Sequence, residues 1–423
     1  MRTKFYALAL TFLGLSATAS AQEFRLATDK ALVPPGRQCG AMEVLEAQLA
    51  ADPSLRQRMA AVEAQTRTFA ANPSANRATA GVVTIPVVVH VVYKTPAENV
   101  LASQIQAQLD VLNQDFAKLN TDASLVPAAF AGLAANTNIQ FVLAKRDPNG
   151  NATTGIVRTL TKTTSWSSND AVKNSKRGGS TAWPASSYLN LWVCNLGQDL
   201  LGYAQFPGGS ASTDGVVVLY SSLPGGTSRP YDKGRTATHE VGHWLNLRHI
   251  WGDASCGNDL VSDTPTQQTA NYGCPTFPHV TCSNQGDMSM NYMDYTDDAC
   301  MYMFSTGQST RMNALFGSGG ARASLVNSLG GTALRQTASV AATADLAAVR
   351  LYPNPATQTL NVTVPAGKGS AWSVKVYDLR GYEMKQARYD GQSHVAVAGL
   401  PQGLYQVVIS DGQQTIQQRF QKE

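Results

Sequence analysis

Three of the chain's six histidines lie in one short segment, His239-Glu240-Val241-Gly242-His243-Trp244-Leu245-Asn246-Leu247-Arg248-His249. If the segment is helical, His239 and His243 are one turn apart on the same face, and both imidazoles can bind one metal ion. With His249 they supply three ligands for a zinc whose fourth position holds water. Glu240 can reach that water without binding the metal, so it is the candidate general base.

The spacing also predicts the local backbone. His249 comes six residues after His243, too far to remain on the same helical face. The helix must therefore end between them, and Asn246 lies where a left-handed residue would end it. The alternative is an ordinary helix with surface histidines, but helix packing gives no reason for three histidines and a glutamate at these offsets.

The segment 239–249 resembles the extended zinc motif of the metzincin metalloproteases, which usually have Gly where this chain has Asn246. Asn291-Tyr292-Met293-Asp294-Tyr295 resembles their Met-turn. The segments 234–238, 263–265 and 297–301 together resemble the pappalysin group, which includes ulilysin-like and cytophagalysin-like enzymes. The likeness covers residues 82–316.

The resemblance implies a role for each of these side chains. It implies zinc binding by His239, His243 and His249, acid–base catalysis by Glu240, a hydrophobic floor from Met293, and an oxyanion hydrogen bond from Tyr295. Zinc lowers the pKa of its water toward about 7, and Glu240 moves the proton from that water to the leaving amine of the peptide bond. From the residues alone, Met293 and Tyr295 could equally be ordinary core side chains.

Two further features bear on the substrate. Residues 201–206 resemble the family's edge strand, to which an extended peptide adds as a further strand; an ordinary buried strand is the alternative interpretation. Related enzymes favour Arg or Lys just after the scissile bond, and Asp297 or Asp298 is the candidate for binding it.

Four cysteines, Cys256, Cys274, Cys282 and Cys300, lie close together, and spacing alone allows three disulfide pairings. A second, structural zinc site is the competing interpretation, although the paired C-x₂₋₄-C spacing is missing. The resemblance implies the pairs Cys256–Cys282 and Cys274–Cys300. Cys194 lies in an apolar run and is expected to be a buried free thiol.

Cys39 lies in Arg37-Gln38-Cys39-Gly40, well before the zinc motif. A thiolate binds zinc strongly and could displace the catalytic water. This segment therefore resembles a cysteine switch that keeps a zymogen latent. An incidental thiol or a Cys39–Cys194 disulfide is the alternative.

A calcium ion is also expected, because oxygen ligands crowd between the cysteines and the family carries calcium in this region. Asp259 and Thr264 are the predicted ligands; polar turn residues are the alternative. 

The elements that position these residues give an α+β pattern. Apolar strands are predicted at 82–93, 139–145, 188–194, 201–206 and 216–220. A helix is predicted after the first strand, with Ser103 as a possible N-cap. Its apolar stripe consists of Ile105, Leu109, Leu112, Phe116 and Leu119. We expect a metzincin-type domain at 79–330, with a twisted sheet and an active-site helix.

The N-terminal region predicts export and latency. Residues 1–21 have a basic start, an apolar stretch and a small-residue end, as in a signal peptide, and the stretch is too short to span a membrane. Residues 22–78 then form a predicted propeptide, helical at 41–69 and ending in an exposed linker with Arg77. A cut in this linker is expected to activate the enzyme.

The C-terminal region reads as a separate small unit. An Ala/Ser/Thr-rich linker is predicted at 331–346, and residues 347–423 have short strands typical of a β-sandwich. The segments 351–356, 400–405 and 420–423 resemble the sorting domain of type IX (Por) secretion. A carbohydrate- or protein-binding β module is the alternative.

Composition bounds the partners. The net charge is +4 without a concentrated basic run, which argues against a nucleic-acid partner, and no later stretch is apolar enough to span a membrane. We therefore expect a monomeric, secreted or cell-surface zinc endopeptidase, exported through the periplasm by type IX machinery and acting on proteins or peptides. The alternatives are a surface binding module on an inactive protease scaffold and a zinc amidase.

Overall fold

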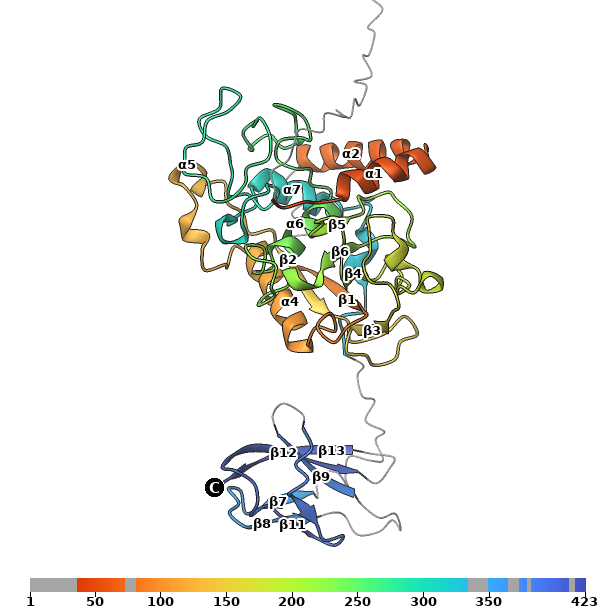
Figure 1. Cartoon of the computed structure of the whole chain (residues 1–423), viewed down its shortest axis with the longest axis vertical. Helices are drawn as coiled ribbons and strands as arrows, with labels where there is room; N and C mark the ends of the chain where they lie inside the picture. Colours follow the sequence, from red (N-terminus) through yellow and green to blue (C-terminus); the bar gives the residue numbers. More distant parts are fainter. Residues whose placement is uncertain (1–35, 73–80, 334–348, 364–372, 379–381, 411–414) are drawn as a thin grey trace, which may run out of the picture. The chain divides into compact units, whose positions relative to one another are not determined.

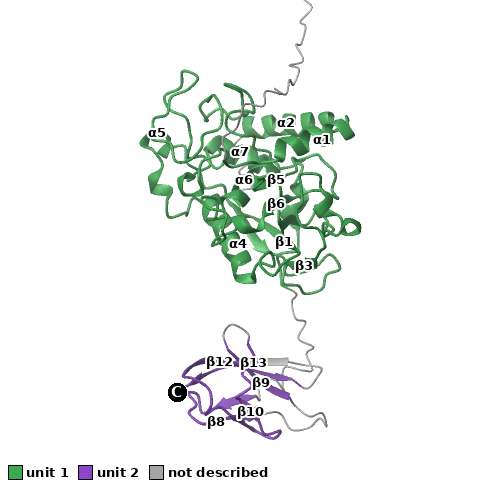
Figure 2. Cartoon of the chain, viewed as in Figure 1, with its two compact units in different colours: residues 1–334 green, residues 335–423 purple. Residues whose placement is uncertain are grey.

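The structure is a computed structural model that describes residues 36–72, 81–333, 349–363, 373–378, 382–410 and 415–423. The chain forms two compact units, residues 1–334 and 335–423 (Figures 1 and 2). The predicted signal peptide, the Arg77 linker and most of the predicted linker 331–346 lie outside the described residues. No helix in the described part of the chain is long and apolar enough to cross a membrane.

A six-stranded mixed sheet forms the core of the first unit. Its strands are β1 (Val83–Tyr93), β2 (Ile139–Leu143), β3 (Ile156–Leu160), β4 (Leu189–Cys194), β5 (Gly202–Ala204) and β6 (Val216–Leu219). The order is β2-β1-β4-β6-β5, with β3 also paired to β1. All pairs are parallel except β5 with β6, so β5 is an antiparallel edge strand. The predicted strands are confirmed, and β3 was missed because none of its side chains is fully buried.

Helices complete this unit. They are α4 (Ala102–Phe116), the short α5 (Ala128–Ala131), α6 (Arg235–Trp244) and α7 (Thr306–Ala314). The apolar side of α4 packs on β2 and α6, and α6 packs on β5 and β6, which places the histidine segment beside the sheet edge. The helix α4 begins after Leu101 without a side-chain cap, so the expectation that Ser103 caps it was wrong.

Two N-terminal helices, α1 (Ala41–Ala51) and α2 (Leu55–Ala71), pack on this domain. One helical segment was predicted here, but Pro53 separates two, because proline cannot donate the main-chain hydrogen bond that a helix interior needs. Leu45, Leu49 and Leu55 bury their side chains against Phe206, which follows the edge strand.

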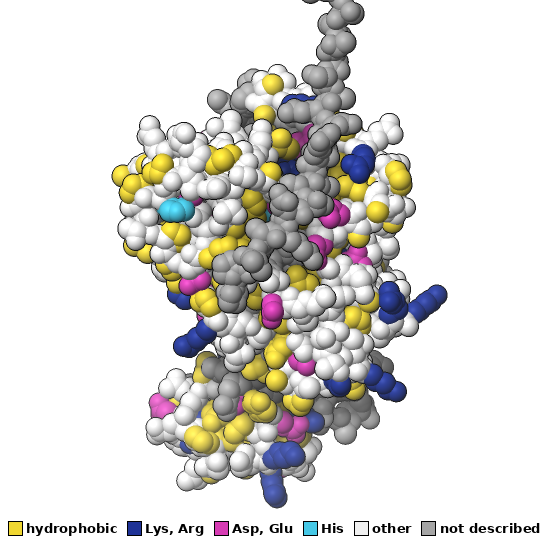
Figure 3. Space-filling model, turned by 45° about the horizontal axis from the view of Figure 1, so that its top comes forward, with side chains coloured by type: hydrophobic (Ala, Val, Ile, Leu, Met, Phe, Trp, Pro, Cys, Tyr) yellow, Lys and Arg dark blue, Asp and Glu magenta, His cyan; other side chains and the backbone are white. Residues whose placement is uncertain are grey.

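The second unit has two antiparallel sheets around an apolar core, as expected for a small sandwich. One contains β7 (Arg350–Tyr352), β8 (Thr359–Thr363), β10 (Arg388–Tyr389) and β11 (His394–Ala396); the other contains β9 (Ser373–Asp378), β12 (Gly403–Ser410) and β13 (Thr415–Lys422). On the face shown in Figure 3, Lys and Arg side chains are scattered rather than gathered into a patch.

Candidate metal centre

The histidine segment begins as helix α6, and its first turn is held by Asp298. The Asp298 carboxylate accepts the main-chain N–H groups of Lys233 at 2.8 Å and Arg235 at 3.2 Å. These donors have no partner within the helix, and a carboxylate is favourable at a helix N-terminus. Every residue of α6 is buried, so the helix presents its polar side chains to the protein interior.

Three imidazoles converge at the end of this helix. The Nε2 atom of His243 lies 3.1 Å from Nε2 of His239 and 3.1 Å from Nε2 of His249. Each ring turns its Nδ1 atom to an oxygen: the Tyr292 and Leu247 carbonyls and the Asp253 carboxylate. The predicted histidines are thus brought together.

This arrangement fits zinc. The oxygen partners select the tautomers with a proton on Nδ1, so the three Nε2 lone pairs face one another and need a cation between them. Two nitrogens at the usual zinc distance of about 2.0–2.1 Å in tetrahedral geometry lie roughly 3.3 Å apart, close to the spacing seen here. The carboxylate–histidine pairing through Asp253 is also typical of histidine metal ligands.

The turn that brings back the third histidine forms at Asn246. This residue has φ 70°, the left-handed conformation predicted for it, and the Leu247 N–H donates to the Gly242 carbonyl at 2.9 Å. Asparagine therefore makes this left-handed turn and ends the helix.

Glu240 and Cys39 meet beside the histidines. The Cys39 thiol donates to the Glu240 carboxylate, with Sγ and Oε2 3.3 Å apart. Sγ belongs to the same cluster as the three histidines, whose candidate ligand atoms all lie within 4.8 Å of one another. Burial raises the pKa of Glu240 to about 8, although the Cys39 hydrogen bond and the charge of Arg37 oppose this shift. Burial also raises the pKa of the Cys39 thiol.

Gly202 on the edge strand allows this approach. A Cβ atom at Gly202 would lie 2.7 Å from Cγ and 2.8 Å from Oε1 of Glu240. Real contacts of that length do not occur, so the side chain of Glu240 depends on a bare α-carbon opposite it.

Met293 and Tyr295 lie beside the histidine cluster. A Cβ at Gly242 would lie 2.4 Å from the Met293 sulfur, so Met293 packs directly under the helix between the first two histidines. The Tyr295 ring centroid lies 5.0 Å from His249 and 5.6 Å from His239, and its hydroxyl forms a hydrogen bond with the Cys39 main chain.

The segment around Cys39 adds to the sheet at its open edge. Cys39 pairs in parallel with Gly202 of β5; the Gly40 N–H donates to the Gly202 carbonyl at 2.9 Å, and the Leu201 N–H donates to the Gln38 carbonyl at 3.0 Å. The strand β5 is therefore an edge that accepts another strand, and here the N-terminal segment of the same chain occupies it.

Arg37 and Asp298 form a fully buried ion pair next to the metal cluster. The Arg37 guanidinium lies over the Tyr231 ring, and its carbon atom is 5.0 Å from the ring centroid. The Nη1 atom of Arg37 donates to the Thr236 hydroxyl at 3.4 Å. Of the two aspartates named from the sequence, Asp298 thus binds a guanidinium, whereas Asp297 remains partly exposed.

Two residues of this centre were missed in the sequence. Arg37 stood two positions before Cys39, and Asp253 stood four positions after His249. The first lies far before the zinc motif, and the second lies just beyond its last histidine. A search for acidic partners near each histidine would have found Asp253.

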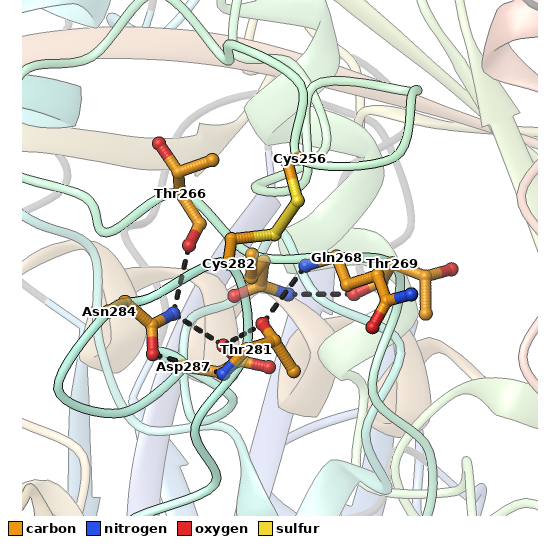
Figure 4. Close-up of a disulfide and its surroundings, with 9 residues drawn as sticks. Cys256, Thr266, Gln268, Thr269, Thr281, Cys282, Asn284 and Asp287 are labelled. Carbon is orange, nitrogen blue, oxygen red and sulfur yellow. Dashed lines mark hydrogen bonds between the residues drawn. A yellow bond between two sulfur atoms is a disulfide. The ribbon is translucent and has the colours of Figure 1, made fainter.

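Two disulfides tie the loops that follow the motif, Cys256–Cys282 and Cys274–Cys300, as the resemblance implied. Figure 4 shows the first beside a network in which Thr281 and Asn284 both donate to Asp287. Cys39 and Cys194 are unpaired, and Cys194 is buried, so the structure has no Cys39–Cys194 disulfide.

The predicted calcium ligands are in contact with each other. The Thr264 hydroxyl lies 2.8 Å from Oδ2 and 3.0 Å from Oδ1 of Asp259, and burial raises the pKa of Asp259 to about 6. Within the described residues, Asp259 does not belong to a group of three or more His, Cys, Asp or Glu side chains that could hold a metal ion.

Comparisons with known proteins agree with this geometry. Residues 172–317 match the Peptidase_M43 family, described as pregnancy-associated plasma protein-A, and residues 350–423 match the secretion system C-terminal sorting domain. An extracellular metalloprotease of Pyricularia oryzae is 32% identical over 327 residues, which are 74% of this chain and 95% of that protein. Extracellular metalloprotease 1 of Coccidioides posadasii is 44% identical, over 37% of this chain and 59% of its own length.

Solved structures are also similar. A variant of Tannerella forsythia promirolysin is 49% identical, with a TM-score of 0.63, covering 68% of this chain and 97% of its own. Mature mirolysin of the same species, in complex with a cleaved peptide, is 53% identical, with a TM-score of 0.57, covering 58% and 96%. The chain therefore belongs to the pappalysin family of zinc metalloproteases and carries a C-terminal secretion sorting domain.

Proposed function

We propose that the chain is a secreted zinc endopeptidase, made latent by its own N-terminal segment and exported by type IX machinery. The observation that carries this proposal is the convergence of three Nε2 atoms with the Cys39 sulfur beside Glu240. The proposed organisation is a signal peptide at 1–21, a propeptide at 22–78, a catalytic domain at 79–330, a linker at 331–346 and a sorting domain at 347–423.

The three histidines would hold zinc through Nε2, and Asp253 and two carbonyls would fix their rings. Zinc there would act as a Lewis acid toward water and the scissile carbonyl. Glu240 would take the proton from the attacking water and give it to the leaving amine, and its buried carboxyl group is suited to both steps. The Tyr295 hydroxyl would donate to the oxyanion once Cys39 has left.

Latency would come from two contacts of the N-terminal segment that occupy the places of the catalytic water and of a substrate side chain. The Cys39 sulfur would take the fourth position on the metal, and Arg37 would fill the pocket for the residue after the scissile bond. The strand direction supports this reading, because the Cys39 segment runs parallel to β5. A substrate paired antiparallel to β5 would run the other way, so the segment would block the site without presenting a cleavable bond.

Asp298 is then the proposed specificity residue. A buried carboxylate that already binds a guanidinium favours Arg, and to a lesser degree Lys, in the substrate. Calcium at Asp259 and Thr264 and a monomeric state remain predictions.

The test uses the full chain, activated by proteolysis in the linker before β1. We expect the activated chain to contain stoichiometric zinc and to lose activity when the zinc is chelated. We also expect it to cleave peptides with Arg after the scissile bond faster than peptides with norleucine there. Stoichiometric zinc without any peptide cleavage would instead favour the inactive-scaffold alternative.

A further inference from the structure

A second charged contact holds the N-terminal segment to the enzyme, away from the metal. Glu63, on α2, accepts from both terminal nitrogens of Arg311, with Nη1 and Oε2 2.9 Å apart. The Asn246 amide also donates to Glu63, at 3.1 Å. Arg311 comes from α7 and Asn246 from the turn of the zinc motif, so the enzyme binds this carboxylate with two separate elements.

Arg311 is held in place independently of Glu63. Its Nε donates to the Asn246 carbonyl at 2.7 Å, and its side chain is 6% exposed. The two terminal nitrogens therefore point at the carboxylate from a guanidinium that the enzyme itself has fixed. A planar, preorganised guanidinium loses little conformational freedom when it binds a carboxylate in this way.

The surroundings favour a negative ligand. Arg248 lies within electrostatic reach of Arg311 and of Asp253, whose carboxylate balances part of this positive charge. When α2 leaves, Glu63 leaves with it, and its negative charge is removed from beside Arg311. The Arg311 guanidinium, still held through Nε by the Asn246 carbonyl, would then offer two aligned donors to an incoming carboxylate.

This site is linked to the metal centre by a short series of contacts. The Phe206 ring lies 5.4 Å from His243, and the Arg248 guanidinium lies 5.8 Å from Phe206. Along the N-terminal segment, Arg37 lies on one side of Cys39, and the helices over Phe206 and Arg311 lie on the other. If Arg37 marks the position after the scissile bond, Arg311 lies on the side that takes residues before it.

We propose that Arg311 and Asn246, with Arg248 beside them, form a carboxylate-binding subsite that opens on activation and takes an Asp or Glu side chain of the substrate, upstream of the scissile bond. Glu63 fills this subsite in the latent chain, as Arg37 fills the Asp298 pocket. The inference rests on the proposed peptidase function.

The experiment uses the activated full chain and a peptide series with Arg after the scissile bond. A single Glu is moved through the upstream positions, and each peptide has Gln and Lys counterparts. We expect one position to favour Glu over Gln by roughly tenfold in kcat/KM, at the low end of what a charge-assisted hydrogen bond contributes, with Lys disfavoured.

Arg311→Gln should remove that Glu/Gln ratio, and Arg311→Lys should keep part of it. The matched control is Arg158→Gln, which removes an arginine on β3 that bonds Asn99 and the Val100 carbonyl; its ratio should equal that of the wild type. If Arg311→Gln fails to fold, the test uses the wild type and Arg311→Lys instead. The kcat/KM values of the Glu, Gln and Lys peptides are then compared between these two proteins.

Equal cleavage of Glu and Gln peptides at every position would overturn the inference, because the contact would then serve only the latent chain. A Glu preference that survives Arg311→Gln would overturn it as well. Failure of the proposed function looks different, since no peptide of the series would be cleaved.

Discussion

Polar side chains are buried very unequally in the two units. In the first unit, the buried set includes Glu240, Asp298, Arg311 and the three histidines. In the described part of the second unit, Lys422 is the one charged or polar side chain in this class. Burying a polar group costs stability unless the group finds a partner. The concentration of buried polar groups in the first unit therefore indicates that this unit holds the functional site. The second unit is an apolar sandwich that needs no such groups to fold.

The strongest way to test this contrast is to remove the proton carrier. Glu240→Gln keeps the size of the side chain but cannot accept a proton, and we expect the activated enzyme to fall below about a hundredth of the wild-type rate, because acid–base groups supply 10²–10⁴-fold. Zinc should remain bound, since Glu240 is not a proposed ligand. Metal analysis and peptide cleavage measure the two effects. A zinc-free variant would contradict the assigned role.

The thiol contact is the next test. Cys39→Ser replaces a strong zinc ligand with a weak one, so we expect the uncut chain to activate faster, by roughly tenfold. The time course of activation at fixed protease concentration measures this. Cys194→Ala is the control, because it removes the other free thiol, which is buried in strand β4 and is not part of the metal cluster. Equal latency in Cys39→Ser would mean that the helices α1 and α2 block the site by bulk alone.

A smaller and more selective effect is expected for the pocket. Asp298→Asn keeps one acceptor oxygen for the N-terminus of α6 but removes the charge opposite a substrate guanidinium. The ratio of kcat/KM for Arg over norleucine after the scissile bond should fall by roughly tenfold or more. Because the ratio is measured within one protein, a general loss of stability does not imitate it. Asp297→Asn should leave the ratio near the wild-type value; a larger effect there would move the specificity role to Asp297.

The smallest effect should follow removal of the second unit. A chain ending after Ala333 should cleave peptides at the wild-type rate once activated. The end is placed there because the Gly330 carbonyl accepts the N–H groups of Lys145 and Arg146, and Arg146 also donates to the Thr332 carbonyl. In the native host this shortened protein should accumulate in the periplasm. Loss of activity in the purified form, or normal export without the unit, would each contradict an address function.

Much of the site could be predicted from the sequence because its signals are local. Two histidines at helical spacing, a glutamate between them and an asparagine at the turn are read within one segment, and the structure places them as expected. The break between α1 and α2 was also visible, since Pro53 lies in the middle of the predicted helix. A proline inside a predicted helix indicates that the helix ends before it.

The rest depends on contacts that spacing does not reveal. Arg37 and Asp298 are 261 residues apart, and Glu63 and Arg311 are 248 residues apart. No periodicity links such pairs; only the docking of the N-terminal helices on α7 and the sheet edge brings them together. The strand β3 was missed for a related reason, because its exposed side chains give no apolar alternation.

The contact between Gly202 and Glu240 has a consequence for how such chains diverge. A Cβ atom at position 202 would lie 2.7 Å from Cγ of Glu240 and 2.9 Å from the main-chain carbonyl oxygen of Val217. One of these contacts is to the proposed base and the other is to the neighbouring strand, so the position is constrained by the sheet as well as by the site. Relatives are therefore expected to keep glycine here even where the glutamate has been replaced.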